Sequence, residues 1–416
     1  MFDKVLHKYE EIRRESDKIR APFLLLYYFA HRAAENVYMR IIKAFYPVDN
    51  HRIILRSFPD YSDNARALAE YLVDNGYDSR YDICFDVSDL NGYKKGRAGI
   101  RFISCETRLG LYRFRWLKDI YTAKYLLFTH RPILIRSRAR KEQVLVNLFH
   151  GNGYKDKSAQ QQNWRAPYDF SITSGDLFVK PMAYFWGTDE DRVFPIGLPR
   201  YNWLLKRDES AKALLDSYKN NPQSKVIIWM PTYRADKKGV YRDTDSITQF
   251  PLIDTEERWK ELDGICRDRN IILLVKLHPF QKEYPIPFAN FSNIKEISDE
   301  DFNRTDVPMY KLLALTDALI SDYSSVAVDY LIVDRPIAFA LEDFEAYHAS
   351  RGFVFEDPRI YMPGHHLYSF EDFVRFLDDV STGKDLYGAE REKIRQIAVC
   401  QSEDFCKGLL EKFGIE

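Results

Sequence analysis

The sequence predicts an α/β protein with two doubly wound domains, each built on a parallel β-sheet. From residue 51 onward, short apolar runs alternate with segments of helical periodicity, a pattern typical of β-α units on a parallel sheet. The alternation restarts after a polar helical connector near residues 200–224. The length of 416 residues also fits two domains of ordinary size.

The first half of the chain alternates strands and helices in order. Apolar runs predict strands at residues 52–58, 81–87, 100–105, 124–129, 144–149, 169–175 and 192–199. Helical periodicity predicts helices at residues 63–76, 111–123 and 178–187. The first of these helices starts at Asp63-Asn64 and stops at Gly76, as polar caps and glycine stops predict.

The second half repeats the pattern after the connector. Strands are predicted at residues 226–230, 271–277, 317–320 and 336–340, with helices between them and closing helices at 385–413. We therefore expect an N-terminal helical segment at 1–50, domains at 51–205 and 206–385, and closing helices at 386–416.

Composition indicates a globular protein of a reducing compartment. Apolar residues make up 45% of the chain and aromatic residues 15%, which excludes a disordered protein. The net charge of −1 predicts no general attraction to polyanions, so nucleic acid is not an expected partner. The cysteines form no C-x-x-C pair, which argues against a disulfide framework or zinc knuckle and for the cytoplasm. They are Cys84, Cys105, Cys266, Cys400 and Cys406.

Two segments are candidates for contact with a membrane surface. The apolar run at residues 21–30 is about half the length of a membrane span, and residues 22–46 together predict an amphipathic helix. Residues 108–141 contain ten Lys or Arg against one acid, Asp119. Either segment fits an anionic membrane surface, and either fits a helix packed on a domain with a solvated face. We keep both interpretations, and with them a cytoplasmic protein with or without peripheral contact to the cell membrane.

Polar residues gather where the strands of the second half end. Ligands of an open parallel sheet bind beyond the carboxyl ends of its strands. Hydroxyls, an imidazole and cations at three such ends indicate an anion site, most simply for a phosphate. These residues are Thr232 and Arg234 after the first strand, Lys276 and His278 at the second, and Ser324 and Ser325 after the third.

The two serines lie between a strand and the next helix. Ser324 and Ser325 precede a helical stretch at 326–333, where free backbone N–H groups attract negative charge. A single serine suffices as a helix cap, so the second serine and Asp329, one turn later, favour a ligand site. His278, which alone would fit a plain His-Pro turn, gains a functional interpretation beside them.

The first half offers one comparable site. His150 ends a strand, Gly151 and Gly153 permit close backbone approach, and Lys155 follows. A histidine there can take a proton from a hydroxyl, although it can also simply shape the glycine turn. The stretch Thr129-His130-Arg131 is a weaker candidate and fits a structural role.

The sequence does not call for a metal. Acidic groups occur at Asp243 and Asp245 and at 189–191, but both lie in polar stretches where acidic clusters are common. Cations near the phosphates would already neutralise their charge, so we expect no metal and no other cofactor.

Taken together, these segments resemble the CDP-glycerol glycerophosphotransferase family, which includes teichoic-acid primases and polymerases and related capsule polymerases. The resemblance covers about residues 51–355. Residues 57–72 are similar to the family's first strand-loop-helix, and 143–155 (QVLVNLFHGNGYK) to its histidine motif. The segment 194–205 is similar to its Gly-x-Pro-Arg segment, which contains Arg200. The donor-site motifs are MPTYR, KLHPF and SDYSSVAVDYLIVDRPIAF, at 230–234, 276–280 and 321–339.

The resemblance implies a GT-B architecture, with two Rossmann-like domains around a central cleft. It implies transfer of an alditol phosphate from a CDP-alditol to a hydroxyl of a teichoic-acid-like or capsular acceptor, either a polymer or a lipid-linked saccharide. His150 would be the catalytic base. His278, Arg234, Ser324 and Ser325 would hold the diphosphate, with Thr232 and Lys276 nearby, and Asp329 would contact the ribose. Gly151, Lys155 and Arg200 would line the acceptor side.

Two departures and two rival functions stay open. The family's His-Gly-Thr-Pro is His-Gly-Asn-Gly here, and its Pro-Gly-Pro is replaced near His365 and His366, which points to a different acceptor or alditol. A GT-B glycosyltransferase using a nucleotide sugar shares the expected architecture. A non-catalytic protein that binds a membrane or polymer would instead use residues 22–46 and 108–141. The sequence specifies neither the alditol nor the oligomeric state.

Overall fold

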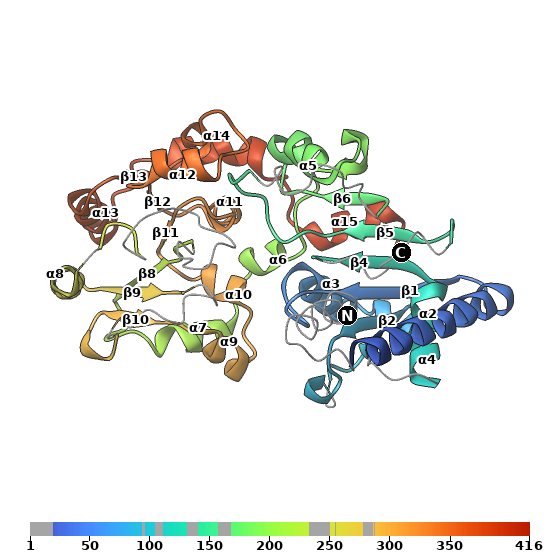
Figure 1. Ribbon diagram of the computed structural model, residues 1–416. Helices are drawn as coiled ribbons and strands as arrows, with labels where there is room; N and C mark the ends of the chain where they lie inside the picture. The colour runs from blue at the N-terminus through green and yellow to red at the C-terminus, as the bar shows by residue number, and fades with distance from the viewer. Residues whose placement is uncertain are drawn as a thin grey trace. The chain divides into compact units, whose positions relative to one another are not determined.

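The protein forms two parallel β-sheets flanked by helices (Figure 1). The computed structural model describes residues 20–93, 96–104, 111–130, 140–156, 168–232, 250–253, 255–277, 286 and 288–416. Strand pairs in both sheets run parallel, for example β1 with β2 and β8 with β9. The predicted α/β class with two parallel sheets is therefore confirmed.

The first sheet has the strand order β3-β2-β1-β4-β5-β6-β7. Its strands are β1 (Asp49–Arg56), β2 (Asp82–Val87), β3 (Arg101–Ser104), β4 (Ala123–Phe128), β5 (Val144–Asn147), β6 (Phe170–Ile172) and β7 (Val193–Phe194). The helices of this half are α2 (Arg20–Phe45), α3 (Asp63–Asp74), α4 (Leu111–Thr122) and α5 (Val179–Trp186). Each predicted strand and helix of this half is present; most are shorter than predicted, whereas β1 starts three residues earlier and β4 is shifted by one residue.

The second sheet has the order β10-β9-β8-β11-β12-β13. Its strands are β8 (Lys225–Trp229), β9 (Ile271–Val275), β10 (Ile294–Glu296), β11 (Ala318–Ser321), β12 (Ile337–Ala340) and β13 (His365–Leu367). The sequence predicts only β8, β9, β11 and β12. The two edge strands were missed because each has three residues, too few to show a periodicity.

The remaining helices follow β7 along the chain, and the last of them packs on the first sheet, where Phe413 contacts Phe170 and Phe194. These helices are α6 (Tyr201–Leu204), α7 (Glu209–Asp216), α8 (Glu256–Asp268), α9 (Asp299–Thr305), α10 (Met309–Leu313), α11 (Val326–Tyr330), α12 (Phe344–Ser350), α13 (Phe370–Thr382), α14 (Gly388–Ala398) and α15 (Phe405–Phe413). Short 3₁₀ turns occur along the chain at Tyr77–Ser79, Asn91–Tyr93, Asp176–Phe178, Glu190–Arg192, Phe288–Asn290 and Pro358–Tyr361. Ser298 and Ser369 begin α9 and α13 with capping boxes, which explains where these helices start.

The core of the second sheet is aromatic. Trp229 of β8 is fully buried and packs edge-on against Phe250 and Phe373, with ring centroids 5.6 and 5.3 Å apart, and beside Trp259 of α8. β9, β11 and β12 are buried along their whole length. Strands covered on both faces read as continuous apolar runs, which is why the sequence revealed them.

Packing divides the chain into two compact units. The first contains the described residues of Met1–Tyr61 and Leu72–Val146, and the second contains Ser62–Tyr71 and the described residues of Asn147–Glu416. The start of α3 and the end of β5 thus belong with the second sheet. The predicted domain limits at residues 50, 205 and 385 stay a prediction, since this division follows packing rather than the β-α pattern.

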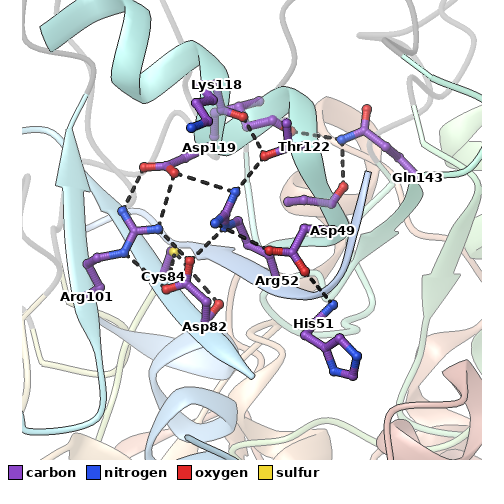
Figure 2. Close-up of polar contacts among 12 residues, drawn as sticks. Asp49, His51, Arg52, Asp82, Cys84, Arg101, Lys118, Asp119, Thr122 and Gln143 are labelled. Atoms are coloured by element: carbon purple, nitrogen blue, oxygen red, sulfur yellow. Dashed lines mark hydrogen bonds and ion pairs between the residues drawn. The ribbon is translucent and has the colours of Figure 1, made fainter. Parts of the chain in front are cut away.

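In the first unit, an ion-pair network holds the strands at their amino ends (Figure 2). Arg52 of β1 donates to Asp82 of β2 at 2.7 Å and to Thr122 of α4 at 2.6 Å. Arg101 of β3 donates to Asp82 and to Asp119, each at 2.7 Å. Burial would raise the pKa of Asp82, but hydrogen bonds from Arg101 and Arg52 outweigh it and lower the pKa to about 2. The stabilisation is therefore complete above pH 3.8 and is lost as the pH falls toward 2.

A buried carboxylate fixes the edge strand β10. Asp263 of α8 accepts hydrogen bonds from the backbone N–H groups of Ser292 at 3.1 Å, Asn293 at 2.7 Å and Ile294 at 3.1 Å. These donors come just before β10 or begin it. One side chain from a helix thus defines where a strand starts that its own sequence does not reveal.

Replacing this carboxylate should therefore destabilise the fold. We expect Asp263→Ala to lower the free energy of unfolding by about 2 kcal/mol or more, because buried N–H groups lose a charged acceptor. Asp268→Ala, at an exposed position of the same helix, should change it by less than about 0.5 kcal/mol. Urea denaturation of both variants measures this, and equal effects would contradict the role of Asp263.

Candidate active site

Apart from the weaker candidate Thr129-His130, the described site residues that the sequence singles out all lie in the second unit. They are His150, Gly151, Lys155, Arg200, Thr232, Lys276, Ser324, Ser325 and Asp329. His278 and Arg234 lie outside the described residues. The geometry of the described set is therefore that of one compact body.

The second sheet brings the predicted strand-end residues to one edge. β8 pairs with β11 and with β9, all in parallel, so their carboxyl ends lie at the same edge. The order β10-β9-β8-β11-β12-β13 reverses its winding direction between β8 and β11. Such a switch point is where open α/β sheets bind ligands. Thr232 follows β8 there, and Ser324 and Ser325 follow β11.

Thr232 and Lys276 are buried and engaged with neighbouring carboxylates. The backbone N–H of Thr232 donates to Asp322 at 2.7 Å, and its hydroxyl donates to the same carboxylate. The Lys276 ammonium lies 2.9 Å from Asp299. These contacts fix the loops after β8 and β9, so a direct contact of either side chain with phosphate stays a prediction.

The serine pair differs from an ordinary helix cap. Ser325 is the residue before α11, yet its side chain makes no capping hydrogen bond. Both serines are partly exposed, whereas the residues on either side, Tyr323 and Val326, are buried. The loop thus presents two hydroxyls beyond the carboxyl end of β11. The capping role that the sequence left open is not what Ser325 does.

His150 lies in a turn that is held by two asparagines. β5 ends at Asn147, whose side chain accepts from the backbone N–H of Phe149 at 2.9 Å. Asn64, at the start of α3, donates to the carbonyl oxygens of Leu148 at 3.1 Å and Phe149 at 3.0 Å. Phe149 has a φ of 53°, and its ring lies 4.3 Å from that of His150. The histidine thus follows a strained, tightly bonded backbone.

The two glycines after His150 pack directly on the serine loop. A Cβ atom on Gly151, whose φ is 124°, would lie 2.7 Å from Ser325 Oγ and 2.7 Å from Arg200 Nη2. A Cβ atom on Gly153 would lie 3.2 Å from the Ser325 backbone. The close approach that the sequence predicted is therefore directed at the serine loop, and it places the residue after His150 against the side chain of Ser325.

Arg200 is buried beneath the turn, which corrects its predicted place on the acceptor side. Its side chain is 3% exposed, and its Nη1 donates to Asp63 at 2.5 Å and to the His150 carbonyl oxygen at 3.0 Å. Its Nη2 donates to Asp329 at 2.5 Å. Burial would lower the pKa of Arg200, but Asp329 and Asp63 outweigh burial and raise it. A permanent cation thus joins three segments of the chain.

Asp329 is not available to a ribose, contrary to the prediction. Its side chain has no exposed surface, and it accepts from Arg200, from the Tyr201 hydroxyl and from the Tyr310 hydroxyl, each at 2.5 Å. Burial raises the pKa of both tyrosines, so their hydroxyls stay protonated and donate. The carboxylate serves this network because α11 directs it into the protein interior.

Lys155 belongs to a short pairing that the sequence did not reveal. Its backbone bridges to Phe353, and the flanking N–H groups of Asp156 and Val354 donate to Gly352 and Tyr154 carbonyl oxygens at 3.1 and 2.8 Å. Its ammonium lies 5.9 Å from the centre of the Tyr347 ring. The segment after the glycine turn is thus tied to the loop after α12.

The weaker candidates are not part of this arrangement. In the first unit, the Thr129 hydroxyl lies 2.9 Å from His130 Nδ1, and Arg131 lies outside the described residues. Asp189 makes a long ion pair with Arg192 at 3.8 Å. Asp243 and Asp245 lie outside the described residues. Across the described part of the chain, no group of three His, Cys, Asp or Glu side chains is arranged to hold a metal ion.

Sequence reasoning missed four residues of the site. Asp63 and Asn64 were interpreted only as the start of a helix, and Tyr201 and Tyr310 carried no signal. Their partners lie far away along the chain, since Tyr201 and Asp329 are 128 residues apart. Only the paired polar residues at the start of α3 gave a hint, because one capping residue would have been enough.

The chain is similar in sequence to a family of known transferases. The family model for CDP-glycerol:poly(glycerophosphate) glycerophosphotransferase matches residues 38–405. A teichoic acid ribitol-phosphate primase of Bacillus spizizenii is 24% identical over 80% of this chain and 81% of its own length. The Staphylococcus aureus teichoic acid ribitol-phosphate polymerase TarL is 24% identical over 60% of this chain but only 44% of its own length. This chain therefore spans most of that primase and less than half of that polymerase.

Solved structures show the same fold. The wall teichoic acid polymerase TagF matches 99% of this chain and 97% of its own, with a TM-score of 0.69 and 18% identity. At this level of identity the likeness concerns the fold alone. The predicted GT-B type of architecture is confirmed by it.

The close approach at Gly151 should make that position intolerant of a side chain. We expect Gly151→Ala to lower the free energy of unfolding by about 1–3 kcal/mol, because its positive φ and the contact with Ser325 both oppose a Cβ. Gly408→Ala is the matched control: it lies in α15 with no atom within 4 Å of the added carbon, and it should be neutral or stabilising. Guanidinium denaturation gives both values, and similar values for the two variants would rule out the predicted contact.

Proposed function

Because the chain belongs to the CDP-glycerol:poly(glycerophosphate) glycerophosphotransferase family, we propose that it transfers an alditol phosphate from a CDP-alditol to an acceptor hydroxyl. The acceptor is a teichoic-acid-like polymer or its lipid-linked precursor, and CMP is the leaving group. The observation that supports this most directly is the packing of the His150 turn on the serine loop at the switch point of the second sheet.

The reaction needs a base and an anion site at short range. His150 takes the proton from the acceptor hydroxyl while the hydroxyl oxygen forms a bond to the β-phosphorus of the CDP-alditol. The bond from this phosphorus to the bridging oxygen breaks, and CMP leaves with the electron pair. Ser324 and Ser325 bind the diphosphate with Arg234 and His278 of the neighbouring strand-end motifs. Phosphoryl transfer depends mainly on such positioning and charge stabilisation.

The donor site is proposed to work without a metal ion. The motifs after β8 and β9 supply Arg234, Lys276 and His278, whose charge offsets that of the diphosphate. Activity that survives EDTA would support this mechanism. Activity that EDTA abolishes and Mg²⁺ restores would replace it with metal-assisted transfer.

The departures from the family pattern concern the acceptor side. Gly153 stands where the family motif has proline, and it packs against the Ser325 backbone. This turn is therefore adapted to the serine loop as well as to an acceptor. A capsular acceptor that contains sugars is the alternative to a simple teichoic chain.

CMP release by the purified protein tests the proposal. We expect release from CDP-glycerol or CDP-ribitol in the presence of a crude membrane acceptor, and none from UDP- or CMP-sugars. The productive donor identifies the alditol. Release only from a nucleotide sugar would favour the rival function, a GT-B glycosyltransferase.

Replacement of His150 then tests its role. We expect His150→Ala to lower kcat about 100-fold or more, because general-base catalysis contributes that much, and His278→Ala to have an effect of similar size. The exposed His51 of the first unit gives a matched control, and His51→Ala should retain activity. Full activity of both His150→Ala and His278→Ala would contradict the mechanism.

The helix α2 supports contact with an anionic membrane surface. One face of α2 packs on α4, where Tyr38 meets Phe114 with ring centroids 5.3 Å apart and Glu35 pairs with Arg113. Exposed apolar side chains recur every four or eight residues along the helix, at Phe29, Val37, Ile41 and Phe45. Within the described residues, no helix has the length and apolarity that a membrane span requires.

Exposed cations accompany this apolar stripe. Arg40 and Lys43 of α2 and Arg115 of α4 are exposed, and α4 lies beside α2 in Figure 1. An apolar stripe with cations beside it suits an interfacial helix on anionic lipid. We therefore assign the protein to the cytoplasmic side of the cell membrane, where a lipid-linked acceptor would be reached.

Binding to vesicles tests this assignment. The double variant Val37→Asp/Ile41→Asp should lower co-sedimentation with phosphatidylglycerol vesicles about 10-fold or more, since two apolar side chains no longer enter the interface. Leu386→Asp/Ile397→Asp changes two exposed apolar residues of the second unit and should have no effect. A dimer in sedimentation velocity that only the α2 variant dissociates would instead identify the stripe as a protein interface.

A further inference from the structure

We propose that Arg200 is a positioning residue that acts through His150, together with Asp63, Asn64, Asp329 and Tyr310. This inference rests on the proposed function of His150 as a base. Arg200 itself does not meet a substrate, because its side chain is almost completely buried. Its effect on catalysis passes through the backbone of the turn that carries the histidine.

The backbone before His150 needs outside support. Phe149 adopts a φ of 53°, a region that bulky side chains rarely occupy unless the surroundings enforce it. Asn64 supplies part of this support by donating to the carbonyl oxygens of Leu148 and Phe149. Asn64 is itself held by the backbone N–H of Arg200, which donates to its Oδ1 at 3.2 Å.

The Arg200 side chain supplies the rest. Its Nη1 donates to the carbonyl oxygen of His150 at 3.0 Å, so the guanidinium fixes the peptide group between His150 and Gly151. The same Nη1 binds Asp63 at the start of α3. Phe149 and His150 are thus restrained from both sides, by Asn64 and by Arg200.

The other end of the guanidinium binds the element that carries the serine loop. Its Nη2 donates to Asp329 of α11, four residues after Ser325. Tyr310 donates to the same carboxylate, and the Arg200 guanidinium lies 4.3 Å from the centre of its ring. One cation therefore links the backbone of the proposed base to the helix that follows the proposed diphosphate loop.

This linkage sets the distance between base and donor within one compact body. The second unit contains the His150 turn, the start of α3, Arg200 and α11. A base displaced by about 1 Å can lose roughly 100-fold in rate, so a fixed link of this kind has catalytic value. Arg200, Asn64 and Asp329 are buried, so they act on catalysis through the backbone they hold rather than by contact with a substrate.

A double-mutant cycle with Arg200→Lys and His150→Ala tests the inference. Lysine keeps one positive charge but cannot bind Asp63, the His150 carbonyl and Asp329 together. We expect Arg200→Lys alone to lower kcat about 30-fold, with the KM for the CDP-alditol changed less than about threefold. In the His150→Ala background the same substitution should lower kcat less than about threefold, because the residue through which it acts is gone.

Arg391→Lys is the matched control for stability. Arg391 is equally buried and binds two aspartates, Asp334 at 3.2 Å and Asp385 at 2.8 Å, at the start of α14. The Arg391→Lys variant should lower the melting temperature about as much as Arg200→Lys does, and it should leave kcat unchanged. A loss of kcat in Arg391→Lys as large as that in Arg200→Lys would reduce the effect to general destabilisation and overturn the inference.

Effects of Arg200→Lys and His150→Ala that multiply would also overturn it, since Arg200 would then act independently of the histidine. If Arg200→Lys fails to fold, Tyr310→Phe takes its place in the cycle, because it keeps the ring on the guanidinium and removes one donor to Asp329. If the donor panel identifies a nucleotide sugar, the proposed function fails, and the cycle run with that sugar still decides whether Arg200 positions His150.

Discussion

Removing the Arg200 guanidinium from water costs several kcal/mol in hydration, and the fold offsets this with Asp63, Asp329 and the His150 carbonyl. An apolar side chain would fill the same space more simply, but it would not fix the direction of each contact. The buried charge determines how the start of α3, the turn after β5 and α11 are arranged. The glycine turn, the serine loop and the orientation of His150 all depend on that arrangement.

Much of the fold could be predicted from the sequence, because central strands are buried on both faces. β8, β9, β11 and β12 are continuous apolar runs, and their alternation with helices implies a parallel sheet. The edge strands β10 and β13 could not be predicted in this way. β10 depends on Asp263, a side chain of another element, and β13 begins with two partly buried histidines. Three residues held by distant partners leave no local pattern.

In the candidate site, too, residues with a local sequence pattern could be predicted, and residues held by distant partners could not. The His150 turn and the serine pair were predicted because their signals are local: a strand end, glycines and adjacent hydroxyls. The roles of Arg200 and Asp329 were not predicted. A polar residue that follows a strand gives the same sequence pattern whether its side chain binds a ligand or a buried partner. Tyr310 and Asn64, which distinguish the two cases here, lie 19 residues from Asp329 and 136 residues from Arg200.

The second unit is assembled from two separate stretches of chain, Ser62–Tyr71 and the described part of Asn147–Glu416. This has a consequence for how such proteins exchange parts during evolution. A crossover between relatives at the connector after residue 205 would take Asp63, His150 and Arg200 from one parent and Tyr310 and Asp329 from the other. The second half of the chain can thus not be exchanged on its own. The second sheet works only together with Ser62–Tyr71, ten residues that follow the first strand of the other sheet. Recombination between relatives should therefore keep the two stretches from the same parent.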